Sequence, residues 1–345
     1  YERTYVPKTT TLVIVGDYPV EVMEAALREK FSDWSGGEAP KDPITGPFDV
    51  DNKGKTDIYI DPSLSESVSI TRFDEWIDEP DTLANRKAAA IRSIGYAIIN
   101  RRLARLARET DAPFAGASFS RGDFFEDARS NGLNIGSLDG EWRKGLLAAV
   151  REYNQAMTYG FTQAEVDEQL ARRRSALENA VKAKDTRSNG AFVGAALSLV
   201  ANEQIPTTPE ANLALFEEVA PLITPDSVFA ALKAHAIPLD EPLIRFQGRT
   251  APEGGKEALR DAFAAAMALP IEPPQDTGKA EFAYTKFGVP GTIVSDTMET
   301  QLGLRQIEFD NGVRLNLKKT DIRIGRINVR VAVDGGALMA TSPSG

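Results

Sequence analysis

The sequence contains one histidine, His235, and no cysteine. A zinc peptidase motif such as His-x-x-Glu-His needs two imidazoles one helical turn apart, so this chain cannot supply it. The missing cysteines exclude disulfides, thiol nucleophiles and cysteine metal ligands, and a serine triad could use only His235. His235 ends a predicted helix, where we expect an exposed side chain or a cation that favours the helix dipole. We therefore assign no catalytic, cofactor-binding or metal-binding residue to this chain.

Two other motifs suggest chemistry but lack the residues it needs. Residues 248–256 lie between a predicted strand and a predicted helix, as a phosphate-binding loop does. However, Thr250 stands where that motif needs glycine, and Glu257 stands where it needs a hydroxyl ligand for magnesium. Arg121-Gly122-Asp123 has the letters of an adhesion motif, but glycine and aspartate are common turn residues, so we expect it to end a strand.

The composition is that of a soluble globular protein, with 42% hydrophobic and 26% charged residues. A net charge of −10 argues against nucleic-acid binding, which needs a basic surface. The Arg172-Arg173-Arg174 run lies one helical turn from Glu168 and from Glu178, which predicts an ion-paired, solvated helix face. No apolar run approaches the roughly 20 residues that span a bilayer. We expect neither nucleic-acid binding nor a membrane span.

The hydrophobic periodicity predicts an α+β fold with helices packed on a mixed or antiparallel sheet. Thr162 and Glu165 form a capping box, and Gly160 ends the preceding helix. Strands are predicted at 12–15, 58–60, 67–71, 117–120, 133–138 and 243–246. Helices are predicted from Val22 to the Phe31–Trp34 region and at 82–110, 141–159, 162–184, 188–200, 209–220, 225–236 and 257–267.

The two ends of the chain differ in character from its middle. Residues 35–47 are rich in glycine and proline and indicate a domain boundary near residue 45. Residues 270–303 predict a second, longer linker. Beyond it, Asn311-Gly312 predicts a tight turn between two strands, and the alternating residues 327–333 predict a third strand. No predicted helix covers this small sheet, which is marginal in water by itself.

Both ends carry ordered motifs of one protein family. Near the start these are Tyr5, Pro7, the apolar run Leu12–Val15, Gly16-Asp17, Phe31 and Trp34. Near the end they are Phe309–Leu315 with its Asn-Gly, then Ile327–Val333 and Gly335-Gly336. This ordered set resembles the insulinase/pitrilysin family of zinc metallopeptidases, in particular its large bacterial members built from two halves.

The resemblance implies a domain organisation. Residues 1–45 would be the C-terminal tail of a first, catalytic-type domain, and 46–269 a complete non-catalytic second domain. Residues 270–303 would be the hinge linker, and 304–345 the truncated start of a third domain. The zinc histidines, the catalytic glutamate and the glutamate ligand would then lie upstream of Tyr1, and the substrate-binding arginine and tyrosine beyond Gly345. The flanking domains of the α+β core would thus be partial.

The same resemblance implies a function for the whole protein. It would be a zinc metalloendopeptidase that encloses a peptide or unfolded protein between two halves, and this chain would form chamber wall and hinge without catalysing the reaction. Zinc would be the cofactor of the whole protein, with no ligand in this chain. The alternative is a zinc-less partner subunit or peptide-binding module of the same family. The bacterial resemblance suggests export to the periplasm, with a cytoplasmic location as the other choice.

Overall fold

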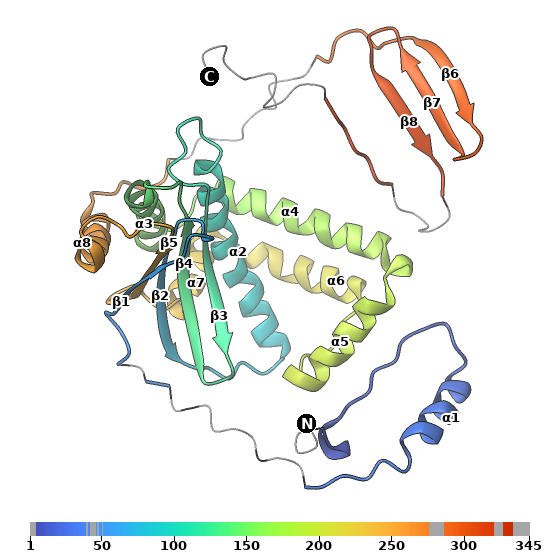
Figure 1. Cartoon of the computed structure of the whole chain (residues 1–345), viewed down its shortest axis with the longest axis horizontal. Coiled ribbons are helices and arrows are strands. Elements are labelled where there is room, and N and C mark those ends of the chain that lie inside the picture. The colour runs from blue at the N-terminus through green and yellow to red at the C-terminus, as the bar shows by residue number, and fades with distance from the viewer. Residues whose placement is uncertain are drawn as a thin grey trace. The chain divides into compact units, whose positions relative to one another are not determined.

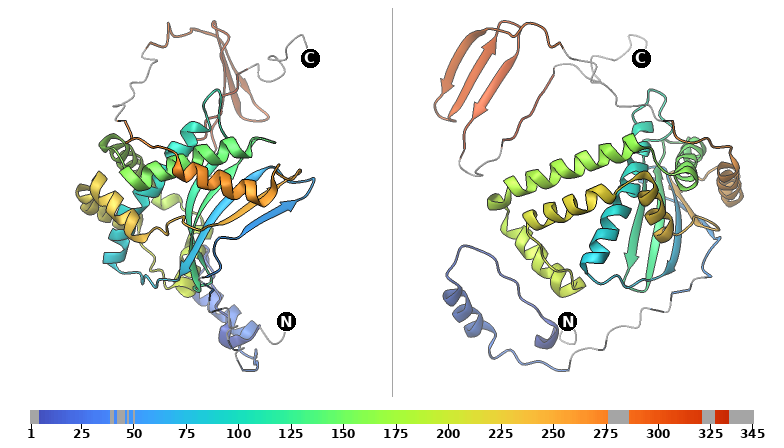
Figure 2. Two further views of the ribbon diagram at one scale, coloured as in Figure 1. Left: turned by 90° about the vertical axis from the view of Figure 1, so that its left-hand side faces the viewer. Right: turned by 180° about the vertical axis from the view of Figure 1, so that it is seen from behind.

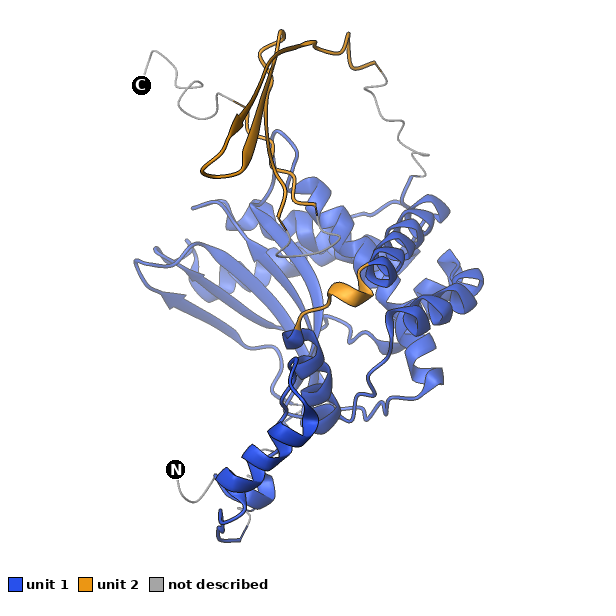
Figure 3. Cartoon of the chain, turned by 90° about the vertical axis from the view of Figure 1, so that its right-hand side faces the viewer, with its two compact units in different colours: residues 1–182, 189–280 blue, residues 183–188, 281–345 orange. Residues whose placement is uncertain are grey.

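A computed structural model of the protein describes residues 5–38, 41, 46, 48–49, 51–275, 286–320 and 327–333. The chain divides into two compact units, shown in different colours in Figure 3. The first contains residues 1–182 and 189–280, and the second contains 183–188 and 281–345. The predicted boundary near residue 45 and the Gly335-Gly336 pair lie outside the described residues.

The first unit is organised around a five-stranded mixed sheet (Figure 1). Its strands are β1 (Thr56–Ile60), β2 (Ser67–Glu75), β3 (Gly116–Phe124), β4 (Ala128–Gly136) and β5 (Leu243–Gly248). Their order is β1-β5-β2-β4-β3; β1 and β5 are parallel, and all other neighbours are antiparallel. The prediction of an α+β fold with a mixed sheet is confirmed.

One face of this sheet is covered by a layer of helices (Figures 1 and 2). Helix α2 (Leu83–Leu106) packs on β3, α3 (Trp142–Tyr159) on β4, and α8 (Gly255–Ala268) on β1 and β5. Because side chains alternate along a strand, every second residue faces these helices. The fully buried side chains of the sheet are on this side, among them Val68, Ile70, Leu133, Ile135 and Phe246.

Further helices pack against α2 rather than on the sheet. They are α4 (Gln163–Lys182), α6 (Pro209–Val219) and α7 (Pro225–His235). Helix α5 (Asn189–Asn202) joins α4 to α6, which lie side by side in both views (Figures 1 and 2). None of the α5 residues is buried, although the helix carries no charged residue. It therefore presents apolar side chains such as Leu197 and Val200 to solvent.

The start of α4 confirms the predicted capping box, and two other helices start in a similar way. The amide of Thr162 donates to Glu165 Oε2 at 2.9 Å, and the amide of Glu165 donates to Thr162 Oγ1 at 3.3 Å. This reciprocal pair satisfies two of the amides that a helix start leaves without partners. Thr208 and Thr224 likewise accept a backbone amide, and each precedes a proline at the first helical position.

The predicted strand at residues 12–15 is wrong. Leu12 and Ile14 are about half exposed, and this stretch belongs to neither sheet among the described residues. An extended segment becomes a strand only when a neighbour pairs with its backbone groups, and no described segment does so here. The helix that follows, α1 (Val20–Phe31), is confirmed, and the rings of Phe31 and Trp34 meet with centroids 6.0 Å apart.

The described part of the second unit forms a three-stranded antiparallel sheet. Its strands are β6 (Ile293–Glu299), β7 (Leu304–Phe309) and β8 (Arg314–Lys318). The β7–β8 hairpin confirms the predicted Asn-Gly turn, where Gly312 has φ +84°. Two predictions fail: β6 lies inside the predicted linker 270–303, and residues 327–333 form no strand. The third strand of this sheet is instead β6, which pairs with β7. The cross-strand pair of Arg305 and Asp296 helps to hold β6 on β7.

Gly160 is required by the backbone at the end of α3. Its φ of 74° and ψ of −136° suit glycine, and an added Cβ would lie 3.0 Å from Phe229 Cγ. We expect Gly160→Ala to lower the free energy of unfolding by about 1–3 kcal/mol, measured by urea denaturation. Gly194→Ala is the matched control, because a Cβ there meets nothing within 4 Å and alanine favours a helix. Equal stability of the two variants would contradict this reading.

Candidate functional site

His235, the one imidazole of the sequence, is the last residue of α7 and lies at a buried polar cluster. Its side chain is 13% exposed, and Nε2 lies 3.5 Å from Arg121 Nη1 and 3.8 Å from Glu79 Oε2. A neutral imidazole accepts at one nitrogen and donates from the other. With Nε2 facing Arg121, the remaining nitrogen is Nδ1, which is buried without a hydrogen-bond partner.

The cluster joins the end of α7 to α2, to the loop before α2 and to β3 and β4, all of which lie about 100 or more residues earlier in the sequence. Arg92 of α2 makes a two-pronged contact with Glu79, at 3.0 and 2.8 Å. Arg121 of β3 lies 3.6 Å from the same carboxylate. Arg129 of β4 donates to the carbonyl oxygen of His235 at 2.6 Å. Three guanidinium groups therefore surround one imidazole, with Glu79 as the carboxylate nearest to the ring.

This environment keeps His235 neutral. Burial, followed by the positive charges of Arg92 and Arg121, lowers the pKa of His235 from 6.5 to about 4. The expectation of an exposed side chain or a cation at the helix end is therefore wrong. The helix-dipole effect on which it rested amounts to roughly 0.3–1 kcal/mol at a surface position, and burial among arginines outweighs it.

The residues around His235 do not fit zinc. A zinc site needs three or four nitrogen, sulfur or carboxylate ligands, and here one imidazole and one carboxylate share their surroundings with three cations. Over the described ranges, no group of three His, Asp or Glu side chains is placed to hold a metal ion. The cluster ties the C-terminal end of α7 to β4 through Arg129, which also pairs with Asp74 at 2.7 Å.

The other motifs singled out from the sequence are placed in ordinary structural surroundings. Arg121–Asp123 lies inside β3 instead of ending it, because the hairpin turn comes later, at Phe125 and Glu126. Arg174 pairs with Glu217 of α6 at 2.7 Å, so the partner predicted from helical spacing, Glu178, is not the one that binds it. Arg172 does pair with Glu168, at 2.9 Å.

The helix-free face of the sheet is the candidate functional surface. Its side chains alternate with the buried ones and are small or polar. They are Ser67, Ser69 and Thr71 of β2, Gly116, Ser118 and Ser120 of β3, Gly132 and Asn134 of β4, and Arg245 and Gln247 of β5. Several of these residues line a depression of about 440 Å³. Such a face can accept hydrogen bonds and contact an extended chain without reacting with it.

An aromatic group borders one end of this face. Phe48 and Phe73 have ring centroids 5.4 Å apart, and Phe124 lies edge-on to Phe73 at 6.4 Å. Phe125, at the hairpin tip, is 75% exposed and has φ 53°. Sequence analysis missed this group, because its members come from three segments and no spacing along the chain relates them.

The chain was compared with protein-family models, curated proteins and solved structures. The family model described as the peptidase M16 inactive domain matches residues 1–172. A search of curated proteins finds no match. The first similar solved structure is the periplasmic protease PqqL from Escherichia coli, with a TM-score of 0.64 and 16% identity. The match covers 89% of this chain and 34% of PqqL, so the chain spans about a third of that protein.

Two further structures share the fold. The first half of PqqL has a TM-score of 0.61 and 15% identity, covering 75% of this chain and 56% of that one. A predicted insulinase family protease from Yersinia pestis has a TM-score of 0.60 and 12% identity, covering 73% and 54%.

The chain belongs to the peptidase M16 family, the family of the insulinase-like proteases, and corresponds to its inactive, non-catalytic part. The resemblance inferred from the terminal motifs is thereby confirmed. No helix in the described part is long and apolar enough to cross a membrane.

Proposed function

We propose that this chain is the non-catalytic central region of a two-half zinc metalloendopeptidase, in which it forms chamber wall and hinge. The match of residues 1–172 to the inactive domain of the family carries the proposal. The whole protein would hydrolyse peptides or unfolded proteins with a zinc ion held by residues outside this chain. Its partner within the enzyme would be the other half of the same protease.

The helix-free face of the sheet supports a wall role. Its residues are mainly serine, glycine and asparagine, which are small and therefore keep the backbone of the strands near the surface. Asn134 and Ser118 are exposed there. Small polar groups hydrogen-bond to many peptide sequences without selecting one. The surface holds no imidazole, since the one histidine of the chain lies on the opposite side, with the helices. A wall of this kind can contact a substrate that is cut elsewhere.

Two exposed apolar surfaces support the view that further protein covers this chain. Helix α5 exposes Leu197 and Val200, and the small sheet β6–β8 exposes Met298 and Leu317. Among its described residues, this sheet has one buried side chain of any size, Ile307. Isolated small sheets are marginal in water, and large exposed apolar patches mark interaction surfaces.

We retain the domain organisation as part of the proposal. Residues 1–45 form the tail of a catalytic-type domain, 46–269 the second domain and 304–345 the start of a third. The hinge is the proline- and glycine-rich segment within 270–303, shortened by the strand that begins at Ile293. We place the protein in the periplasm, as PqqL is described, with the cytoplasm as the alternative.

The complete protein tests this proposal against a zinc-less partner subunit. A His-x-x-Glu-His motif encoded before Tyr1 predicts a protein that cleaves an unfolded peptide and loses that activity to a chelator. Replacing the motif glutamate should abolish cleavage while leaving the melting temperature unchanged. If the motif is absent and the complete protein neither binds zinc nor cleaves peptides, the partner-subunit function replaces the enzyme.

A further inference from the structure

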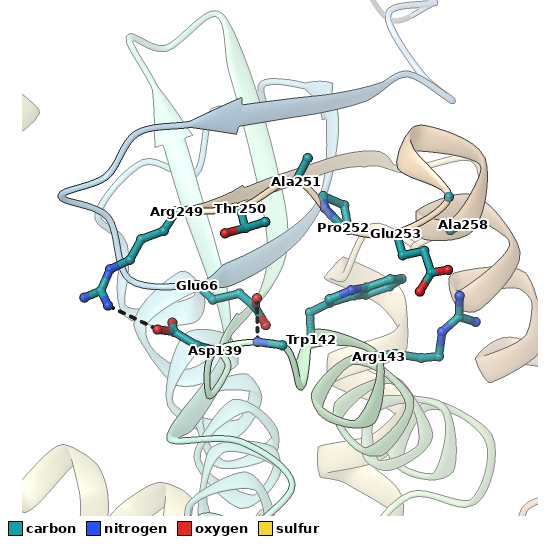
Figure 4. A pocket seen from close by; sticks show the side chains of 12 residues that line it. Glu66, Asp139, Trp142, Arg143, Arg249, Thr250, Ala251, Pro252, Glu253 and Ala258 are labelled. Carbon is teal, nitrogen blue, oxygen red and sulfur yellow. Dashed lines mark hydrogen bonds and ion pairs between the residues drawn. The ribbon is translucent and has the colours of Figure 1, made fainter.

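A pocket of about 680 Å³ opens where three segments of the first unit meet (Figure 4). These segments are the loop before β2, which contributes Glu66, the loop from β4 to α3 and the loop from β5 to α8. Trp142, at the start of α3, forms one wall, and Arg143 lies with its guanidinium carbon 5.0 Å from the indole centroid. Thr250 and Glu253 line the opposite side.

Glu66 places a carboxylate in this pocket. The residue is 7% exposed, and its Oε2 accepts the backbone amide of Gly140 at 3.0 Å. Its Oε1 is buried and has no hydrogen-bond partner. Burying an ionised carboxylate without partners is costly, and nearly all buried polar groups in folded proteins are paired. Because Glu66 lines an open pocket, its unpaired Oε1 indicates that a hydrogen-bond donor from a bound molecule completes the site.

The charges around the pocket favour a positively charged donor. Its lining contains the carboxylates of Glu66, Asp139 and Glu253 and the guanidinium groups of Arg143 and Arg249. Three negative and two positive groups leave one negative charge. Arg249 pairs with Asp139 at 3.2 Å, and Arg143 stacks on the indole, so neither arginine donates to Glu66 Oε1.

We propose that this pocket binds a lysine side chain of a peptide substrate, with the ammonium group donating to Glu66 Oε1. The aliphatic stem of the lysine would lie against Trp142, since long cationic side chains bury their methylene groups on apolar surfaces. The substrate identity rests on the proposed protease function, which it deepens by naming a basic substrate. Every residue that lines the pocket belongs to this chain, so lysine binding can be tested on the chain by itself.

Trp142 serves as the reporter for a binding test. The sequence has three tryptophans, Trp34, Trp76 and Trp142, so replacing the first two by phenylalanine leaves the pocket indole as the one fluorophore. We expect saturable fluorescence changes on titration of the full chain with Nα-acetyl-lysine N-methylamide. The norleucine analogue, which lacks the ammonium, should bind at least tenfold more weakly.

Glu66→Gln keeps the shape of the side chain and removes its charge. A hydrogen bond to a charged group is worth about 1.5–3 kcal/mol, so we expect this variant to bind the lysine probe about tenfold to hundredfold more weakly. Its melting temperature should equal or exceed that of the parent, because an unpaired buried charge is removed. Glu75→Gln, at the far end of β2 and outside the pocket, should bind as the parent does.

Several outcomes would overturn the proposal. They are equal affinities of lysine and norleucine probes, equal affinities of the parent and Glu66→Gln, and no saturable signal with the lysine probe, as expected if Glu66 bonds only to water. If the complete protein proves to be a zinc-less subunit while the chain still binds lysine, the protease assignment fails and the binding site stands.

Discussion

Replacing Arg102 by methionine is expected to lower the free energy of unfolding by roughly 3 kcal/mol, the lower end of the range for breaking a buried ion pair, because it leaves the half-buried carboxylate of Glu165 without its main partner. The Arg102 side chain is 4% exposed and donates to Glu165 from Nε and Nη2, at 2.6 and 2.7 Å. It also donates to the carbonyl of Gly160 at 3.2 Å. One guanidinium thus ties α2 to the end of α3 and to the capping box of α4.

The hydrogen bonds from Arg102 also affect the pKa of Glu165. Burial alone would raise the pKa, but hydrogen bonds from Arg102 and from the Thr162 amide outweigh burial and hold the pKa below its usual value. A carboxyl with a depressed pKa stabilises the fold above its unfolded pKa and loses that contribution as the pH falls through the folded value. Acid should therefore weaken this junction.

Urea denaturation followed by circular dichroism measures the effect. Arg101→Met is the matched control, because Arg101 makes an exposed pair with Glu168, at 3.2 Å, worth at most about 1 kcal/mol. In the double variant Arg102→Met/Glu165→Gln the unpaired, half-buried charge is gone, and glutamine can still serve in the capping box, so most of the lost stability should return. A single variant within 1 kcal/mol of the parent, as judged against Arg101→Met, would refute the role of this pair.

The second large effect is a pH dependence of stability that comes from His235. Its folded-state pKa of about 4 lies below the ordinary 6.5, so the unfolded chain takes up the proton first as the pH falls. The stability contribution is therefore complete above pH 6.5 and is lost between pH 6.5 and about 4. At 1.36 kcal/mol per pKa unit, the loss amounts to about 2–3 kcal/mol by pH 4.5.

His235→Gln is neutral at every pH, and its amide can still accept from Arg121. The difference in unfolding free energy between this variant and the parent should thus shrink or reverse between pH 7 and pH 4.5. Since the sequence has one histidine, its imidazole proton gives a unique NMR signal. We expect that signal to titrate near pH 4; a midpoint near 6.5 would mean that the ring is not enclosed by Arg92 and Arg121.

Local signals predicted the local parts of this fold well. Thr162 and Glu165 identified a helix start because capping involves residues three apart, and Gly312 identified a hairpin because its turn needs a left-handed residue. Residues 12–15 were misjudged because a strand depends on a neighbour, and apolar sequence cannot say whether one is present. The partner of Arg174 was misjudged for the same reason, since Glu217 comes from another helix.

The functional features depend still more on tertiary contacts. The low pKa of His235 arises from burial and from the positive charges of Arg92 and Arg121, which lie more than 100 residues away in the sequence. Glu66 gave no signal at all, as a single glutamate before a strand is ordinary until its free oxygen is seen to be buried in a pocket. The absence of paired histidines, by contrast, was evident from the sequence, because two imidazoles cannot be assembled from one.

Peptide hydrolysis by this 345-residue chain in the presence of zinc, measured beside the complete protein, is the most direct test of its non-catalytic assignment. We predict chelator-sensitive cleavage of an unfolded peptide by the complete protein and none by the chain. Robust cleavage by the chain alone that a chelator abolishes would contradict the assignment, because it would require a zinc centre within these residues.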